Sequence, residues 1–283
     1  MTLFKEAAAL AKHVSQLKQD GNSIGFAPTM GALHVGHISL IQKSKLICNI
    51  TVSSIFVNPT QFNDPKDFEK YPVTIGNDIL LLEKAGCDIL FLPSIAEIYP
   101  SGTTPKKRYE LGEIEFLLEG KFRPGHFQGV CQVVHRLLDI VQPDKLFLGQ
   151  KDYQQCLVVK RLVQLIDLPV EVVTAETYRE PSGLAMSSRN LRLNEQQKQD
   201  AAGISKMLQY VKENFFTTPF SDLLNYTTQY LQASGFSKVD YVSIADADTL
   251  QSINKVSEEG KLVALIAAFI GEVRLIDNAV LQD

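Results

Sequence analysis

The chain has 283 residues, a length that suits one large domain or two modest ones. Its 28 Lys and Arg residues against 32 Asp and Glu give a net charge of −4, which argues against a surface built to bind nucleic acid or an anionic membrane. Hydrophobic residues make up 45% and charged residues 21%, so the chain can bury a real core and disorder is disfavoured.

The first 175 or so residues alternate between helical and strand patterns. Apolar residues spaced three and four apart predict an amphipathic opening helix from Leu3 to Leu17 that ends near Gly21. Later apolar runs predict, in order, strand 23–27 closed by Pro28, a helix from about Gly36, strand 49–57, helix 79–85, strand 87–92, helix 129–141, strand 145–148, helix 153–166 and strand 170–174.

This alternation predicts an α/β fold with a doubly wound parallel sheet covered by helices on both faces. In such sheets, ligands bind beyond the carboxyl ends of the strands. Unusual polar segments follow three of the expected strands, at residues 28–37, 58–62 and 149–152. We therefore expect the functional site at that edge of the sheet.

The composition changes near Thr177, which predicts a first domain over residues 1–177 and a smaller α+β domain over 178–283. In the second domain we expect a polar helix over 194–215 capped by Asn194, with Gln197 three residues on, then helix 220–234 and strands 239–244 and 261–270. Two polar, Pro-containing stretches, Asp64 to Tyr71 and Pro100 to Lys107, are predicted to be loops that could cover a site.

Several features favour a cytoplasmic location. The four cysteines, at positions 48, 87, 131 and 156, form no CxxC pair and are expected to be buried thiols in a reducing compartment. The N-terminus lacks the apolar run of a signal peptide. The longest apolar stretch, Leu262 to Ile270, is far shorter than the ~20 residues that a membrane span needs.

The segment PTMGALHVGH, residues 28–37, places His34 and His37 three apart at a strand-to-helix turn. The two histidines could belong to a plain surface turn or to a metal pair, but no Asp, Glu or Cys stands at a ligand spacing. An anion site fits better, because a helix N-terminus offers free N–H groups that imidazoles at the same turn can supplement. This HxGH pattern is similar to that of nucleotidylyltransferases and class I aminoacyl-tRNA synthetases.

Two further segments strengthen the anion interpretation. Ser187, Ser188 and Arg189 form a loop rich in hydrogen-bond donors that would suit phosphates, although it could also be a solvated hinge. Lys151 and Asp152 begin a helix just after a strand. The lysine can neutralise a phosphate, and the aspartate can accept from a ribose hydroxyl, help to hold Mg²⁺, or simply stabilise the first helical turn.

Five motifs in fixed order, PTMGALHVGH, FVNPTQF, EGKFRPGHFQGV, FLGQKDYQQ and GLAMSSRN, together resemble the pantothenate synthetase (pantoate–β-alanine ligase) family. The likeness runs from about residue 25 to 195, with a family-like RLIDN at 274–278. It implies ATP-dependent joining of (R)-pantoate and β-alanine through a pantoyl-adenylate, with release of AMP and pyrophosphate, on the way to coenzyme A. It also implies a homodimer, a Rossmann-like ATP- and pantoate-binding domain at 1–177, and a C-terminal lid at 178–283.

The resemblance also implies roles for individual residues. The catalytic set is His34, His37, Lys151 and Arg189. The ATP-binding set is Met30, Gly31, Ala32, Leu33, His34, Val35, Gly36, His37, Gly149, Gln150, Lys151, Asp152, Tyr178, Met186, Ser187, Ser188 and Arg189. Gln61 and Gln155 would bind pantoate, and Gln61 would also lie beside β-alanine. Mg²⁺ would be carried mainly by the ATP phosphates, without a direct protein site.

Some positions in these motifs keep two interpretations. Arg123 could face a phosphate or order the loop before the helix at 129, and His126 is expected to be structural. Asn58 is expected to support the pantoate pocket and Met30 to cover one side of it. Gln150 stands where the family more often has Glu, so a charge beside Lys151 is missing.

The alternative functions are an adenylyl- or cytidylyltransferase, which shares HxGH but needs neither NPTQF nor the two glutamines, and a catalytically silent nucleotide-binding protein. The size and the lack of a basic appendage exclude a class I tRNA synthetase. Anionic substrates require a locally positive pocket, to which Arg123, Lys151 and Arg189 contribute +3 and Asp152 −1. The acidic excess is expected elsewhere, on residues such as Glu110, Glu113, Glu115 and Glu119.

Overall fold

The computed structural model describes residues 1–104, 107–253 and 260–282. The elements up to residue 175 are β1 (Thr2–Phe4), α1 (Ala7–Gln19), β2 (Ile24–Thr29), α2 (Val35–Ile47), β3 (Ile50–Ile55), η1 (Pro59–Gln61), α3 (Pro65–Glu69), α4 (Ile75–Lys84), β4 (Ile89–Phe91), α5 (Ile95–Ile98), η2 (Glu113–Glu115), α6 (Leu118–Phe122), α7 (His126–Val141), β5 (Lys145–Gly149), η3 (Gln150–Asp152), α8 (Tyr153–Leu165) and β6 (Glu171–Ala175). They are followed by η4 (Ser188–Arg192), α9 (Glu195–Ala201), α10 (Gly203–Asn214), α11 (Phe220–Ala233), β7 (Lys238–Asp246), β8 (Leu262–Ile270) and β9 (Val273–Gln282).

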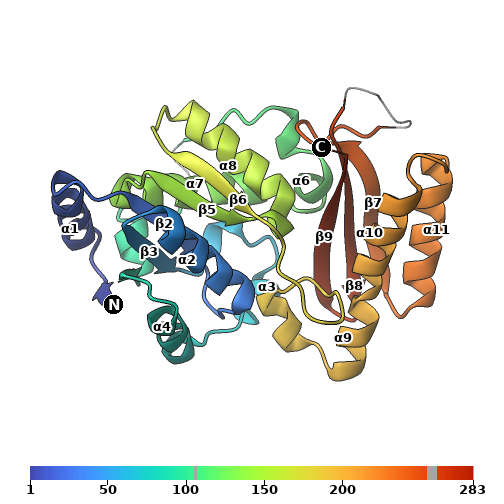
Figure 1. Ribbon diagram of the computed structural model, residues 1–283, viewed down its shortest axis with the longest axis horizontal. Helices are drawn as coiled ribbons and strands as arrows, with labels where there is room; N and C mark the ends of the chain where they lie inside the picture. Colours follow the sequence, from blue (N-terminus) through green and yellow to red (C-terminus); the bar gives the residue numbers. More distant parts are fainter. Residues whose placement is uncertain (105–106, 254–259, 283) are drawn as a thin grey trace.

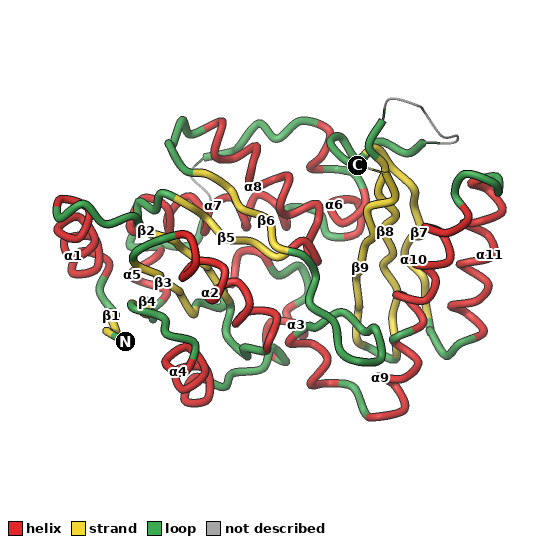
Figure 2. Tube along the Cα trace, in the orientation of Figure 1, coloured by secondary structure: helices red, strands yellow, loops and turns green. Residues whose placement is uncertain are grey.

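Within the described residues, the strands form two sheets, which lie side by side in Figures 1 and 2. The larger sheet has six parallel strands in the order β1-β4-β3-β2-β5-β6, and the smaller one has three antiparallel strands in the order β7-β8-β9. This arrangement confirms the expected Rossmann-like sheet with a smaller C-terminal α+β unit. The boundary at residues 177 and 178 stays a prediction.

Helices cover both faces of the large sheet because successive strand residues point in opposite directions. Ile24 and Phe26 of β2 pack with α1, α7 and α8 in one apolar cluster. Ala27 points the other way and packs with residues of α2 and α4. Gly25 lets α2 approach closely, since a Cβ there would lie 2.1 Å from Ser44 Oγ. The sheet is thus buried on both sides, as its continuous apolar strands predicted.

The apolar run of β8 is buried on both faces rather than in a membrane. One set of alternate residues, which includes Ala264 and Ile266, packs under α10 and α11, which cover one face of the small sheet in Figure 1. The other set, Val263 and Leu265, packs against Leu117 and neighbouring side chains of the first domain. In the part of the chain that the structure describes, no helix is long and apolar enough to cross a bilayer.

Some sequence expectations were wrong in detail. Pro28 does not close β2 but lies inside it, opposite Ser54 of β3. Because β5 pairs with β2 only at residues 25 and 26, the end of β2 has a neighbouring strand on one side only and tolerates a proline. The helix expected over 194–215 is two helices that meet at Ala202, although its Asn194–Gln197 capping box is present. The polar stretch 64–71 contains α3. Part of the loop expected at 100–107 lies outside the described residues.

Candidate active site

The ends of four strands meet at one edge of the large sheet. The parallel register pairs Thr29 of β2 with Ile55 of β3. It likewise pairs Gly149 of β5 with Ala175 of β6. The chain runs from β2 to β3 and β4 on one side of β2, and it then crosses from β4 to β5 on the other side. The strand order therefore reverses between β2 and β5, and a crevice forms at this switch point. A cavity of about 230 Å³ lies beyond these strand ends.

Most of the expected site residues line this cavity, namely Met30, His34, Gly36, His37, Gln61, Gly149, Lys151, Asp152, Gln155, Tyr178, Met186, Ser187, Ser188 and Arg189. Other described members of the expected nucleotide-binding set do not line it: Gly31, Ala32, Leu33, Val35 and Gln150. Of these, Gly31 and Ala32 face a separate hollow that Asp78 also lines. The structure thus gathers the two histidines, the two glutamines and the basic loops in one place.

The two histidines stack at the N-terminus of α2. Their ring centroids are 4.0 Å apart, and the His34 backbone N–H donates to His37 Nδ1 over 3.3 Å. Because Nδ1 of His37 accepts, its neutral ring carries the hydrogen on Nε2 and can donate from there. Gly36 makes room for this stack, since a Cβ at that position would lie 3.0 Å from the His34 ring.

Both imidazoles are held neutral near pH 7. Burial, followed by the positive charge of Lys151, lowers the pKa of His34 to about 4. Burial also lowers the pKa of His37 well below its ordinary value, and the neighbouring His34 and Lys151 act in the same direction. These side chains therefore act as neutral hydrogen-bond donors and acceptors rather than as cations.

Asp78 of α4 holds the turn that carries the histidines. Its buried carboxylate accepts from the backbone N–H groups of Ala32 (3.0 Å) and Leu33 (2.8 Å) and from the Thr74 hydroxyl (2.9 Å). Sequence reasoning missed this residue. The spacing of Asp78 places it on the same helix face as Ile75 and Leu82. This was the available signal, because an acidic side chain on a face that packs against the protein needs hydrogen-bond donors nearby.

A buried amide network fixes Gln61. Asn58, 1% exposed, donates through Nδ2 to Gln61 Oε1 (3.1 Å), while its Oδ1 accepts from the Tyr99 hydroxyl (2.7 Å). With its oxygen occupied in this way, Gln61 points its Nε2 toward Met30 Sδ at 3.0 Å. Asn58 and Met30 thus both contact Gln61, and their roles at a pantoate pocket stay predictions; Tyr99 was missed by the sequence reasoning.

Arg123, which follows the last residue of α6, and His126, the first residue of α7, both contact the Gln61 backbone. His126 Nδ1 lies 2.7 Å from the Gln61 carbonyl and Arg123 Nη2 lies 3.3 Å from it. The second ring nitrogen of His126, Nε2, lies 3.2 Å from Arg123 Nη1. Burial, with help from Arg123, lowers the pKa of His126 to about 3, so this ring is neutral and accepts from the guanidinium.

The loops expected to hold phosphates are tied to neighbouring elements. Ser188 Oγ donates to the Ala32 carbonyl over 2.9 Å and so joins η4 to the histidine turn. Arg189 Nη2 donates to Asp67 Oδ2 of α3 over 2.7 Å. Asn278 of β9 donates to the carbonyls of Gln150 (2.9 Å) and Lys151 (3.0 Å). The C-terminal unit therefore supports the Lys151 backbone directly.

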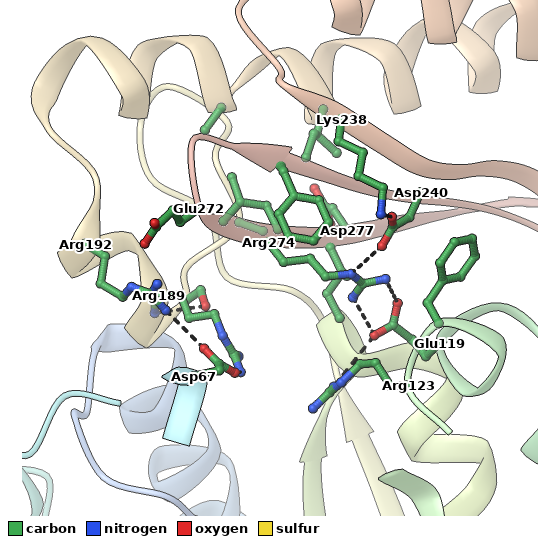
Figure 3. Close-up of a pocket in the computed structure, with 18 of the residues that line it drawn as sticks. Asp67, Glu119, Arg123, Arg189, Arg192, Lys238, Asp240, Glu272, Arg274 and Asp277 are labelled. Atoms are coloured by element: carbon green, nitrogen blue, oxygen red, sulfur yellow. Dashed lines mark hydrogen bonds and ion pairs between the residues drawn. The ribbon is translucent and has the colours of Figure 1, made fainter. Parts of the chain in front are cut away.

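A second cavity, of about 570 Å³, shares lining residues such as Lys151 and Arg189 with the first and lies beside the small sheet. Figure 3 shows the charged side chains that line it. Among the described residues, it is lined by eight Lys and Arg and seven Asp and Glu side chains, so its charges nearly cancel. Glu119 lies here, not on a remote acidic surface as expected; it accepts two hydrogen bonds of 2.8 Å from Arg274 and one from Tyr241. The sequence-based count of +3 and −1 covered only four of the fifteen charged side chains that line this cavity among the described residues.

Over the described ranges, no group of three or more His, Cys, Asp or Glu side chains could hold a metal ion. Asp152 is a carboxylate of the first cavity, and it lies 3.6 Å from Lys151 Nζ.

Known proteins resemble the chain over its whole length. A family model described as pantoate-β-alanine ligase matches residues 2–280. A pantothenate synthetase of Cytophaga hutchinsonii is 45% identical over 274 residues, 96% of each chain, and one of Porphyromonas gingivalis is 41% identical over 283 residues, 100% of each.

Solved structures agree with these sequence matches. The pantothenate synthetase of Thermus thermophilus has a TM-score of 0.92 at 36% identity, with 100% of both chains covered. The pantoate-β-alanine ligase of Francisella tularensis, complexed with β-γ ATP and β-alanine, has a TM-score of 0.81 at 38% identity and covers 99% of this chain and 97% of its own. The resemblance inferred from the ordered motifs is confirmed, and the chain belongs to the pantoate–β-alanine ligase family.

Proposed function

We propose that this ligase makes pantothenate in two steps within the first cavity. In the first, a carboxylate oxygen of (R)-pantoate attacks the α-phosphorus of ATP, so that an acyl–phosphate bond forms and pyrophosphate leaves. In the second, the amine of β-alanine attacks the acyl carbon of the pantoyl-adenylate, an amide forms, the amine loses a proton, and AMP leaves. The attack of the carboxylate on ATP needs no strong base. Positioning and charge stabilisation therefore carry the catalysis of that step.

The observation that carries this proposal is the neutral histidine stack at the N-terminus of α2. The His37 Nε2 hydrogen and the free N–H groups at the start of the helix can donate to the oxygens of the α-phosphate, where negative charge builds up during attack. A neutral imidazole remains a donor throughout, so no change of protonation is required. We therefore assign His37 and His34 to the α-phosphate.

The two glutamines are assigned to pantoate. Gln61 and Gln155 line the same cavity, and an amide can donate to a carboxylate and accept from a hydroxyl. Gln61 has its oxygen bound by Asn58, so its Nε2 is the group that can donate to substrate. Gln61 would also lie beside the incoming β-alanine.

The basic loops are assigned to the nucleotide. Lys151, Ser187, Ser188 and Arg189 would hold the triphosphate, with Met186 beside it, while Gly149, Asp152 and the Tyr178 backbone would contact the nucleoside. Gly31, Ala32, Leu33, Val35 and Gln150 belong to the expected nucleotide-binding set but do not line the first cavity, so they would support the loops that carry its ligands. Mg²⁺ would arrive with the phosphates and neutralise part of their charge. We also infer a cytoplasmic homodimer with residues 178–283 as a lid; the four buried, free thiols are compatible with a reducing compartment.

The test is exchange of labelled pyrophosphate into ATP. A pantoyl-adenylate route predicts exchange that requires pantoate but not β-alanine, and AMP and pantothenate that appear together only when all three substrates are present. A nucleotidylyltransferase would instead keep the nucleotide in its product. Continued AMP release in the absence of β-alanine, or exchange without pantoate, would count against the ligase mechanism.

A further inference from the structure

Asp67 of α3 is held by two arginines of η4 at the junction of the two cavities. Its Oδ2 accepts from Arg189 Nη2 over 2.7 Å, and its Oδ1 accepts from Arg192 Nη1 over 3.0 Å. Figure 3 shows the two guanidiniums converging on this one carboxylate. The three side chains are 20–27% exposed, so the group is largely shielded from solvent.

Arg189 and Arg192 have the geometry of an anion-binding site, and the carboxylate of Asp67 is the anion that occupies it. Two guanidiniums that each reach one oxygen of a carboxylate can equally reach two oxygens of a phosphate, whose charge and donor requirements are similar. Burial opposes ionisation of Asp67, but the Arg189 hydrogen bond and the charges of both arginines outweigh it and lower the pKa of the carboxyl, so it is ionised. An entering phosphate therefore meets a negative charge already bound to its ligands.

Arg192 is outside the residue set that the family resemblance assigned, yet it lines the 570 Å³ cavity next to Arg189. We propose that the carboxylate of Asp67 competes with the terminal phosphates of ATP for Arg189 and Arg192, and that Arg192 is a second phosphate-binding guanidinium of this site. This inference rests on the proposed function, because it takes Arg189 as a ligand of the triphosphate.

Competition has a measurable consequence for affinity. If the arginines are bound to Asp67 about 90% of the time, the apparent affinity for a phosphate chain is reduced about tenfold, in proportion to the free fraction. Replacing Asp67 by Asn keeps the shape of the side chain but removes its charge. The variant should therefore bind phosphates more tightly than the native chain does.

A matched control separates displacement from a general change in charge. Glu272 also lines the cavity, but it pairs with Lys70 (2.7 Å) rather than with the two arginines. Glu272→Gln changes the net charge of the cavity by the same amount as Asp67→Asn. We expect Asp67→Asn to lower the Kd for inorganic tripolyphosphate and for ATP, measured by calorimetry, about 5- to 10-fold, and Glu272→Gln to change it less than about twofold.

The role of Arg192 is tested in the background that lacks its carboxylate partner. If Arg192 contacts phosphate, Arg192→Gln should raise the Kd for tripolyphosphate about tenfold in the Asp67→Asn chain as well as in the native chain. Thermal unfolding of each variant checks that the fold is retained. The inference would be overturned by any of three results. The Kd for tripolyphosphate could be unchanged or higher in Asp67→Asn, or it could fall equally in Glu272→Gln. The third result is that Arg192→Gln leaves this Kd unchanged in the Asp67→Asn background.

Two outcomes keep this inference apart from the proposed function. If Arg189→Gln weakens tripolyphosphate binding and the native chain forms AMP with all three substrates, but Arg192→Gln has no effect in the Asp67→Asn chain, then this inference fails and the proposed function stands. If Arg189→Gln binds tripolyphosphate as well as the native chain does, and the native chain gives no pantoate-dependent exchange, then the proposed function fails and the inference falls with it.

Discussion

The two cavities share the lining residues Arg123, Lys151, Asp152, Ser187 and Arg189 but are built on different principles. The cavity at the strand ends presents neutral groups whose orientation is fixed by other residues, such as His37 and Gln61. The cavity between the sheets presents charges that are mostly paired already, such as Arg189 with Asp67 and Arg274 with Glu119. A preorganised neutral donor acts without first losing a partner, whereas a paired cation must exchange one anion for another. The first design suits the reacting atoms, and the second suits phosphates that enter and leave.

The largest expected effect is at the neutral cavity. Replacing His37 by Ala should lower the rate of pantoyl-adenylate formation ~10²-fold or more, because a donor to the developing charge is removed. Pantoate-dependent pyrophosphate exchange measures it, with His13→Ala on the exposed side of α1 as the control. Near-native exchange in His37→Ala would remove the residue from the catalytic set.

The next effect tests whether Asp78 of α4 positions the turn that carries the two histidines. Asp78→Asn should lower kcat about tenfold and the free energy of unfolding by about 1–3 kcal/mol, since two backbone N–H groups lose a charged acceptor. Asp144 is the matched control, because it accepts from the Ile24 N–H (2.7 Å) at the opposite end of β2. Asp144→Asn should reduce stability and leave kcat unchanged; a loss of kcat in both variants would indicate general destabilisation.

A smaller effect separates the substrates within the neutral cavity. Gln155→Ala should raise the KM for pantoate about tenfold and leave the KM for ATP nearly unchanged, since an amide partner of pantoate is removed. Its neighbour Gln154 points elsewhere and bonds the backbone of residues 114, 117 and 119. Gln154→Ala should lower the Tm with little change in either KM. Equal rises in both KM values for Gln155→Ala would place Gln155 in a different pocket.

A last effect concerns the pH dependence of stability, outside the reacting groups. The folded pKa of His126 is about 3, below the ordinary 6.5, so between these values the unfolded chain binds more protons than the folded one. The stability from keeping this ring neutral is complete above pH 6.5 and is lost as pH falls toward 3, by at most about 1.4 kcal/mol per pH unit. Urea unfolding between pH 7 and 4 should therefore show a shallower pH slope for His126→Asn than for the native chain. Parallel slopes would mean that His126 is protonated in the fold.

Much of the fold follows from local pattern. Apolar strands between amphipathic helices predicted the parallel sheet, and the polar segments after those strands predicted the edge at which the cavity lies. The pairing of Asn194 with Gln197 was also predictable, because the two residues are one helical turn apart. The short strand β1 and the strand β9 were missed, since three residues carry too little pattern and the RLIDN segment was taken only as a motif.

The sequence by itself determined the chemistry available at the site: two histidines, two glutamines and a basic loop in a fixed order. Only the tertiary structure decided which of these groups are neutral and which are already paired. Asp78 reaches a turn 46 residues away, Asp67 reaches an arginine 122 residues away, and Glu119 reaches one 155 residues away. Burial sets the protonation of the histidines, and the partners of a charge depend on the path of the whole chain, so neither can be read from local sequence.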